Sequence, residues 1–280
     1  MEALLERSRD FFAAPAAAPT SRDRRKRRVK IVVVVALACF VVKTGSGHAA
    51  QTQTLGLGVS PTKLKRDKRK PAVISITSTT LNETAPNRIP SPTVYASFNF
   101  DDDFVFNGRI ARQKVCRREW LDSLSTQLAI ARCPDSVLGT GAAVARFPWP
   151  VDESHPYGYE ELATELTAFK GPAEAGTGRP QLVILARVES AAYGGALLGT
   201  IRPSRSGKDF GYRLDISVPT FLDGLAALTD FEIEIGRGNG RGYVTARCAD
   251  RNRMLNMNGR ITYLDGSSLG ASASSRCFPV

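Results

Sequence analysis

One short stretch of this chain matches a nucleophile signature of hydrolytic enzymes. The segment GSSLG, from Gly266 to Gly270, fits Gly-x-Ser-x-Gly and would place Ser268 on a turn between a strand and a helix. The following residues, ASASSRC, show no helical periodicity and include no histidine partner. We therefore interpret LDGS as the Asp-Gly turn of a β-hairpin, in which Gly266 takes a positive φ.

Two acidic groups could also support chemistry. Asp101 to Asp103 could bind calcium, but the segment lacks the spaced oxygen ligands and the glycine of a calcium loop, so a hairpin turn is predicted. Glu160, Glu161 and Glu165 lie in YEELATEL, and pairs of carboxylates hydrolyse glycosides. Neighbouring glutamates on a surface segment are usually solvated, so a carbohydrate-acting extracellular enzyme using either acidic group is the alternative function.

The cysteines favour an oxidising compartment. Apart from Cys39, which lies in an apolar run, four cysteines remain: Cys116, Cys133, Cys248 and Cys277. An even number in an exported chain predicts two disulfides, and of the three possible pairings we favour the sequential one. No two of these cysteines lie two to four residues apart, and His155 is the only histidine after residue 50, so no zinc site is expected.

The first 50 residues have the order of an export signal. Basic RDRRKRRVK precedes the twelve-residue apolar run IVVVVALACFVV, and small and polar residues follow it. Cleavage is expected after Ala49 or Ala50, giving a secreted or cell-surface protein. The run is shorter than the roughly 20 residues that span a bilayer. An uncleaved anchor in the plasma membrane, formed by residues 29–42, is the alternative.

The net charge of +11 is confined to two segments. Residues 1–50 hold ten basic and four acidic residues, and 63–70 hold six and one, whereas the remainder holds 22 of each. A nucleic-acid partner is therefore not expected. Residues 51–70 are interpreted as a basic flexible linker that could lie against anionic wall polymers or lipid headgroups. Its basic residues are Lys63, Lys65, Arg66, Lys68, Arg69 and Lys70.

From residue 71 to 280 the pattern predicts antiparallel strands. TVYASFNF, YRLDISV and FEIEI alternate apolar and polar residues, and QLVILARV is uniformly apolar, as in a central strand. The alternation places Arg213 and Asp215 on the polar face of YRLDISV. Domain 71–280 is therefore predicted to be all-β, antiparallel and sandwich-like, with one short helix between Cys116 and Cys133.

That helix is limited by the disulfide expected around it. In DSLSTQLAIARC, Leu121, Leu124, Leu128 and Ala131 would share one face, and Pro134 prevents continuation. If all of 117–132 were helical, its ends would stand about 24 Å apart. Because bonded cysteines need Cα atoms within about 7 Å, the helix should be short, capped near Ser123, with 117–122 returning as extended chain.

The carboxyl-terminal part resembles a family of exported proteins of high-GC Gram-positive (actinobacterial) type. The resemblance covers about residues 93–280, and its motifs are VCRREWLDSLSTQLAIARCPDSVLGTGAAV, LTAFKG, RPQLVILARV, ISVPTFLDGLAALTDFEIEIG and VTARCADRNRMLNMNGRITYLDGSSLGASASSRC. The acidic segment VDESHPYGYEELATEL departs from the pattern and is expected to be a local elaboration. The resemblance implies a β-rich fold with two cysteine pairs and no assigned activity.

The sequence thus predicts an exported structural or ligand-binding module of the cell envelope. It offers no catalytic constellation and no cofactor or metal site, and the residues singled out for a structural role are the four cysteines. The alternatives are the carbohydrate-acting enzyme and a membrane-anchored envelope protein.

Overall fold

The computed structural model describes residues 51–280 except 83, 85–87, 109–113, 192, 208, 237–241 and 250–251. The strands are β1 Gln51–Ser60, β2 Lys63–Leu64, β3 Lys70–Asn82, β4 Thr93–Asp101, β5 Phe104–Phe106, β6 Val137–Pro148, β7 Tyr159–Lys170, β8 Gln181–Val188, β9 Tyr193–Pro203, β10 Phe210–Ser217, β11 Ala227–Ile235, β12 Val244–Ala246, β13 Met254–Tyr263, β14 Ser268–Arg276 and β15 Phe278–Pro279. The helices are α2 Thr126–Arg132 and the 3-10 turns η1 Arg118–Trp120, η2 Pro134–Ser136, η3 Glu189–Ala191 and η4 Phe221–Gly224. The predicted signal lies outside the described residues.

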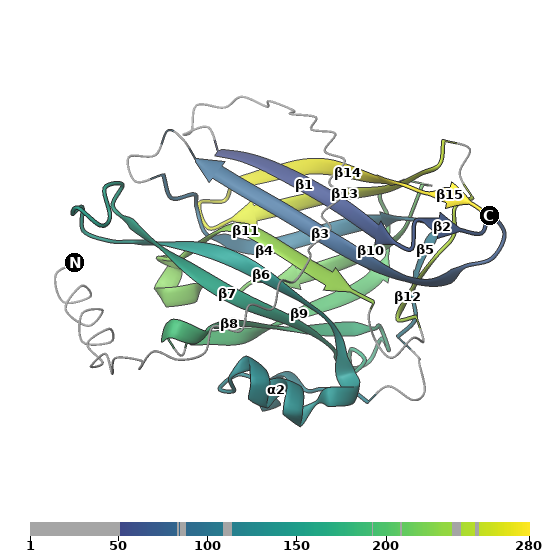
Figure 1. Ribbon diagram of the computed structural model, residues 1–280, viewed down its shortest axis with the longest axis horizontal. Coiled ribbons are helices and arrows are strands. Elements are labelled where there is room, and N and C mark those ends of the chain that lie inside the picture. The colour runs from purple at the N-terminus through teal and green to yellow at the C-terminus, as the bar shows by residue number, and fades with distance from the viewer. Residues whose placement is uncertain are drawn as a thin grey trace, which may run out of the picture. The chain divides into compact units, whose positions relative to one another are not determined.

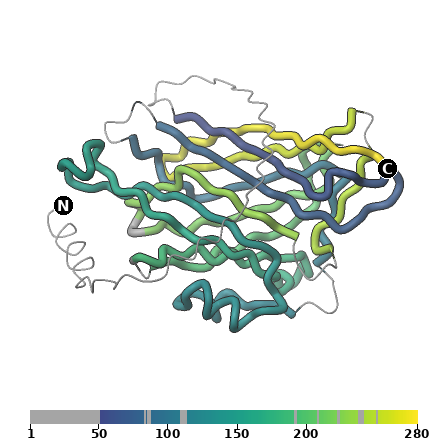
Figure 2. Tube along the Cα trace, viewed as in Figure 1, coloured from purple at the N-terminus to yellow at the C-terminus, as the bar shows by residue number. Residues whose placement is uncertain are grey.

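Almost every strand belongs to one antiparallel sheet (Figure 1). Its order is β14-β13-β4-β10-β9-β8-β7-β6-β11-β3, and β3 then pairs with β1 on its other edge. The sheet curls so far that β1 contacts β14 and β13, and the path of the chain in Figure 2 follows this curl. The predicted all-β antiparallel class is confirmed, with both layers of the sandwich-like arrangement supplied by a single curled sheet.

The inner face of the curled sheet carries the main core. Ala96, Phe98 and Phe100 of β4 and Ile233 and Ile235 of β11 point inward, as their alternation predicted. Phe98 and Phe231 meet edge to face, with ring centroids 6.2 Å apart. Burying such aromatic and aliphatic side chains supplies most of the free energy that closes the sheet.

β8 is buried on both faces, because a second layer covers the outside of the sheet. Leu182 and Ile184 point into the main core, whereas Val183 and Leu185 pack under the segment 116–133 together with Phe169. This explains why QLVILARV is uniformly apolar and confirms it as a central strand.

α2 is short, as the disulfide required. Its N-cap is Ser125, whose side chain accepts a hydrogen bond from the Leu128 amide, rather than a residue near Ser123. The predicted apolar face is wrong: Ala129 is the buried residue of the helix, and Leu128 is 59% exposed. The helix begins later than expected, so Leu121 and Leu124 precede it and share no helical face with Leu128.

The approach to α2 also differs from the prediction. Residues 118–120 form the turn η1 instead of returning as extended chain. The turn buries Leu121 completely, and the Leu124 amide then bonds the Leu121 carbonyl. A tight turn shortens the path between the two cysteines as effectively as an extended return.

Both predicted disulfides are present. Cys116 pairs with Cys133 and Cys248 with Cys277, with Cα atoms 5.8 and 5.9 Å apart. The first closes the ring that contains α2, and the second joins the chain after β12 to the chain after β14. All four sulfurs lie in buried clusters, so the disulfides hold elements that pack on the sheet or continue it.

The interpretation of residues 51–70 as a flexible linker is wrong. Residues 51–60 form β1, which pairs with β3 through all ten residues. β2 adds a parallel pair with β15, and Leu64 between the lysines is fully buried. The stretch QTQTLGLGVS contains Leu55, Leu57 and Val59 at a spacing of two, so its inward face is apolar.

Two glycines of β6 permit a close approach between neighbouring strands. A Cβ at Gly139 would overlap the carbonyl oxygen of Glu234, and one at Gly141 the carbonyl oxygen of Glu232. The Gly-x-Gly pattern in LGTGAAV is therefore required for β6 to pack against β11.

We expect removal of the first disulfide to destabilise the fold without abolishing the sheet. The double variant Cys116→Ala and Cys133→Ala should lower the free energy of unfolding by about 3 kcal/mol, because the bond closes a loop of 17 residues. Urea denaturation measures this, with exposed Ser123→Ala in the same loop as the control. An unchanged midpoint would show that α2 is held by packing alone.

Candidate functional site

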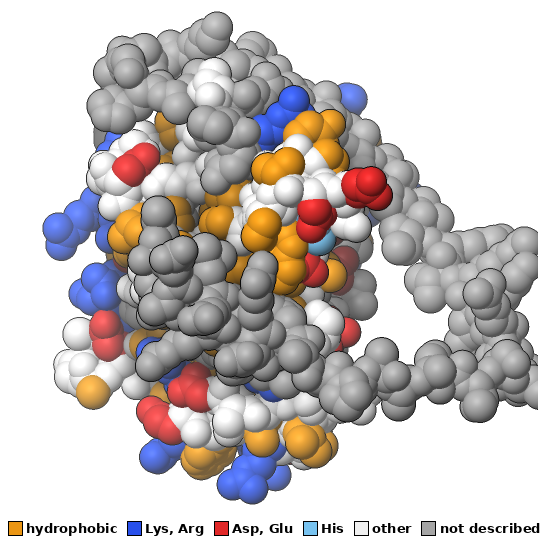
Figure 3. Space-filling view, turned by 90° about the vertical axis from the view of Figure 1, so that its left-hand side faces the viewer, with side chains coloured by type: hydrophobic (Ala, Val, Ile, Leu, Met, Phe, Trp, Pro, Cys, Tyr) orange, Lys and Arg blue, Asp and Glu red, His pale blue; other side chains and the backbone are white. Residues whose placement is uncertain are grey.

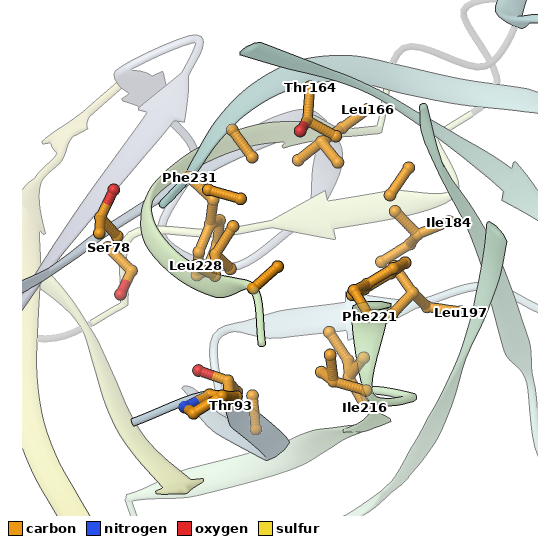
Figure 4. A pocket seen from close by; sticks show the side chains of 18 of the residues that line it. Ser78, Thr93, Thr164, Leu166, Ile184, Leu197, Ile216, Phe221, Leu228 and Phe231 are labelled. Carbon is orange, nitrogen blue, oxygen red and sulfur yellow. The ribbon is translucent and has the colours of Figure 1, made fainter. Parts of the chain in front are cut away.

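The inner face of the curled sheet forms an apolar cavity of about 140 Å³. Side chains reach it from β3, β4, β6, β7, β8, β9, β10, β11 and β13 and from η4. Figure 4 shows Leu166, Ile184 and Leu197 converging on the space from one side and Leu228 and Phe231 from the other. Carbon atoms form nearly all of its surface, so it suits an apolar guest.

The space exists because several inward positions carry small residues. Ala143 and Ala145 on β6 and Ala186 on β8 line the cavity where a sheet core normally holds larger side chains. Missing side-chain volume at neighbouring strands thus adds up to one void.

A few hydroxyl groups lie at one edge of the otherwise apolar lining. Ser78 and Thr80 of β3 contribute hydroxyls to the lining, and Figure 4 shows Ser78 and Thr93 at its edge. Behind them, Thr80 and the Tyr263 hydroxyl donate to Gln53 Oε1 over 2.7 and 2.6 Å, and Gln53 donates to Ser78. Burial raises the pKa of Tyr263, so its hydroxyl stays neutral. This edge is uncharged and hydrogen-bonded.

A second polar cluster lies on the outer face of β4 and β10. Asp215 is 7% exposed and accepts hydrogen bonds from Tyr95 over 2.5 Å and from Arg213 over 2.9 Å. Burial and the Asp215 hydrogen bond raise the pKa of Tyr95 to about 12. Arg202 Nε lies 3.6 Å from the same carboxylate. The alternation placed Asp215 on a polar face but gave no sign that it is buried.

Ser268 is not a nucleophile on an elbow. It lies on β14, paired with Thr262 of β13, and its hydroxyl lies 3.2 Å from the Thr262 hydroxyl. Gly266 has a φ of 81°, and its amide bonds the Tyr263 carbonyl. The hairpin interpretation of LDGS is confirmed.

The predicted hairpin at Asp101 to Asp103 is wrong in one respect. The chain turns there, but β4 pairs with β10 and β13, whereas β5 pairs with β12. The Asp101 carboxylate accepts bonds from the Asp103 amide and from the Asn256 amide and side chain, and burial raises its pKa. The turn joins strands of different parts of the sheet.

The three carboxylates lie within 4.8 Å of one another, as in a cation site. Arg247 supplies the positive charge, because its Nε is 2.6 Å from Asp103 Oδ1 and its Nη2 is 3.9 Å from Asp102. The hydrogen bond to Asp103 raises the pKa of Arg247. Asp103 Oδ2 also accepts the Ala249 amide. The cluster fixes the chain next to Cys248 and has the contacts of a structural ion pair.

The glutamates of YEELATEL lie on β7. Successive residues of a strand point to opposite faces, so Glu160 and Glu161 diverge. Glu161 pairs with Arg146 over 3.1 Å, and Glu165 is exposed on the same outer face. The segment extends the β6–β7 hairpin, and hydrophobic and acidic side chains are mixed on the end of the molecule seen in Figure 3.

His155 lies between those two strands, near the tip of the hairpin. Its Nδ1 is 2.9 Å from Asp152, which also accepts the His155 amide. The ring packs against Trp149, with centroids 5.3 Å apart. His155 therefore contacts only neighbouring residues of the β6–β7 connection in these interactions, and they hold it in that turn.

The basic run is part of the folded surface. Arg69 donates to the carbonyl oxygens of Asp102 and Asp103, and the Lys65 carbonyl accepts the Cys248 amide. Four of its basic side chains remain exposed: Lys63, Lys65, Arg66 and Lys68. The glycine-rich connection 236–242 joins β11 to β12, with 237–241 outside the described residues.

Comparison with known protein families, curated proteins and solved structures finds no match to this chain. In the described part of the chain, no helix is long and apolar enough to span a membrane. Sequence reasoning did not find the cavity or the Tyr95–Asp215 cluster. Both are formed by residues from strands far apart in the chain, and neither leaves a local motif.

We expect Asp103→Asn to lower the free energy of unfolding by about 2 kcal/mol, because it removes a charged hydrogen-bond acceptor whose side chain is 3% exposed. Exposed Asp102→Asn is the matched control and should cost less than about 0.5 kcal/mol. Urea denaturation gives both values. If added calcium raised the midpoint of the wild type but not of Asp103→Asn, the structural interpretation would be wrong.

Proposed function

We propose that this protein is an exported ligand-binding module of the cell envelope that holds a small apolar molecule inside its curled sheet. The observation that carries the proposal is the apolar cavity of about 140 Å³. An engineered cavity of about 150 Å³ in another protein binds benzene. A guest of that size would fill the space.

Energetics favour a guest over an empty space. Protein interiors are close-packed, and each void costs stability because the side chains around it lose contacts. Here the void is lined by Ala143, Ala145 and Ala186. A leucine or valine at these positions would fill the void without adding a polar group. A bound apolar molecule would recover the lost contacts and stabilise the fold by mass action.

Export is supported by the disulfides, which form and persist in oxidising compartments. β1 follows directly after the predicted cleavage positions, Ala49 and Ala50, so cleavage would leave all ten of its residues. The exposed lysines and arginine of the basic run would then face anionic wall polymers or lipid headgroups. The resemblance to actinobacterial exported proteins agrees with this location.

Toluene and a cavity-filling variant test the ligand-binding function. We expect toluene to bind the wild type and to bind Ala143→Leu at least tenfold more weakly, because the added side chain occupies the void. Isothermal titration calorimetry measures the affinities. Ala142→Leu, next along β6 and exposed, is the control and should bind as the wild type does. Equal binding to all three proteins, or no binding at all, would contradict the proposal.

Cell fractionation tests the location. We expect the protein outside the cytoplasm, with an amino terminus at residue 50 or 51 after cleavage behind Ala49 or Ala50, as determined by mass spectrometry. Recovery of the uncleaved chain from the plasma-membrane fraction would instead support the anchor formed by residues 29–42. Reactive thiols at Cys116 or Cys248 in the native protein would argue against export.

A further inference from the structure

The wall of the curled sheet splits between β9 and β10. Their ladder ends at the pair of Leu198 with Ser217, although β9 continues to Tyr193. Beyond this point the Val218 amide bonds the Val94 carbonyl, on the β4 side. The Ala196 amide bonds the Asp122 carboxylate, from the disulfide ring, over 3.1 Å. The Asp122 side chain therefore accepts the hydrogen bond that a neighbouring strand would otherwise accept from Ala196.

The split brings the inside and the outside of the sheet close together. Outside it lies a groove of about 490 Å³, lined by residues of β4, β9, β10 and η1. Leu197, Val218 and Pro219 line both this groove and the apolar cavity. The two spaces are therefore neighbours at these three residues. Figure 4 labels Leu197 on the cavity side.

The groove and the cavity differ in chemistry. The groove carries two guanidinium groups, Arg118 and Arg202, against one carboxylate, Asp215, which Arg213 already neutralises. It also carries the hydroxyls of Tyr95, Thr200 and Ser217. Guanidinium groups donate hydrogen bonds and accept none, so their ligand must be an acceptor, and they suit carboxylate or phosphate best. An apolar space and a groove with two arginines, which share three lining residues, match a molecule with one apolar end and one anionic end.

The protein's own carboxylates satisfy these arginines incompletely. Asp215 already accepts short bonds from Tyr95 and Arg213, so Arg202 lies 3.6 Å from it and 3.3 Å from Glu174. Arg118 lies 3.9 Å from Asp122, which also accepts the Ala196 amide. Both arginine side chains are more than a third exposed, so an anion in the groove could form closer, charge-assisted bonds with them.

We propose that the ligand is an amphiphile with an anionic head, which places its apolar part in the cavity and its carboxylate or phosphate in the groove beside Arg118 and Arg202. This inference rests on the proposed ligand-binding function and names the class of ligand. The split between β9 and β10 is the passage through which the apolar part enters.

Octanoate, its uncharged analogue methyl octanoate, and toluene are the probes. We expect octanoate to bind the full chain at least tenfold more tightly than methyl octanoate. In Arg202→Gln and in Arg118→Gln the affinity for octanoate should fall about tenfold, while that for the ester stays unchanged. Arg205→Gln removes an equal charge from an exposed loop and is the matched control. Added salt should weaken the binding of octanoate but not the binding of its methyl ester or of toluene. Octyl phosphate distinguishes a phosphate head from a carboxylate head.

The outcomes separate the two proposals. If toluene binds but octanoate binds no more tightly than its ester, or if both arginine variants bind octanoate as the wild type does, the anionic-head inference is wrong and the cavity function stands. If toluene and octanoate both fail to bind, the cavity function fails and the inference falls with it. An equal loss in Arg205→Gln would show a general charge effect and would also overturn the inference.

Discussion

The structure depends on the closure of one sheet. A sheet must bury its apolar face against another layer or against itself. Here the sheet curls until its end strands, β1 and β14, meet. Leu55 of β1 reaches across to Gly259 of β13, where a Cβ would collide with it. β1 therefore completes the core, to which it contributes Leu57 and Val59.

When the sheet closes, some apolar residues still point outward and the chain ends still need to be held. The two disulfides lie at the segments that cover these places. Cys116–Cys133 holds the segment with α2 over Val183 and Leu185. Cys248–Cys277 holds the chain next to Asp103, Arg247 and the β2–β15 pair. Each disulfide thus holds short elements against the sheet. Such short elements bury little apolar area of their own, so a covalent bond helps to keep them in place.

The sequence revealed the features that leave local patterns. Alternation identified β4, β10 and β11, uniform apolarity identified β8, and chain proximity favoured the cysteine pairs. β1 could have been found from Leu55, Leu57 and Val59, but its glutamines, threonines and glycines resembled a linker. The cavity could not be predicted, because it is an absence of side-chain volume shared between β6 and β8. The burial of Asp215 depends on residues from three separate segments.

The split between β9 and β10 connects the sheet with the first disulfide and the outer groove. Ending the ladder between β9 and β10 would leave the Ala196 amide without a partner, at a cost of about 1–3 kcal/mol if buried. Asp122 removes this cost, and Arg118, one turn before it, lines the outer groove. Both residues belong to the ring that Cys116 and Cys133 close. The ring thus does more than cover β8: through Asp122 it satisfies the Ala196 amide at an edge of β9 that has no neighbouring strand.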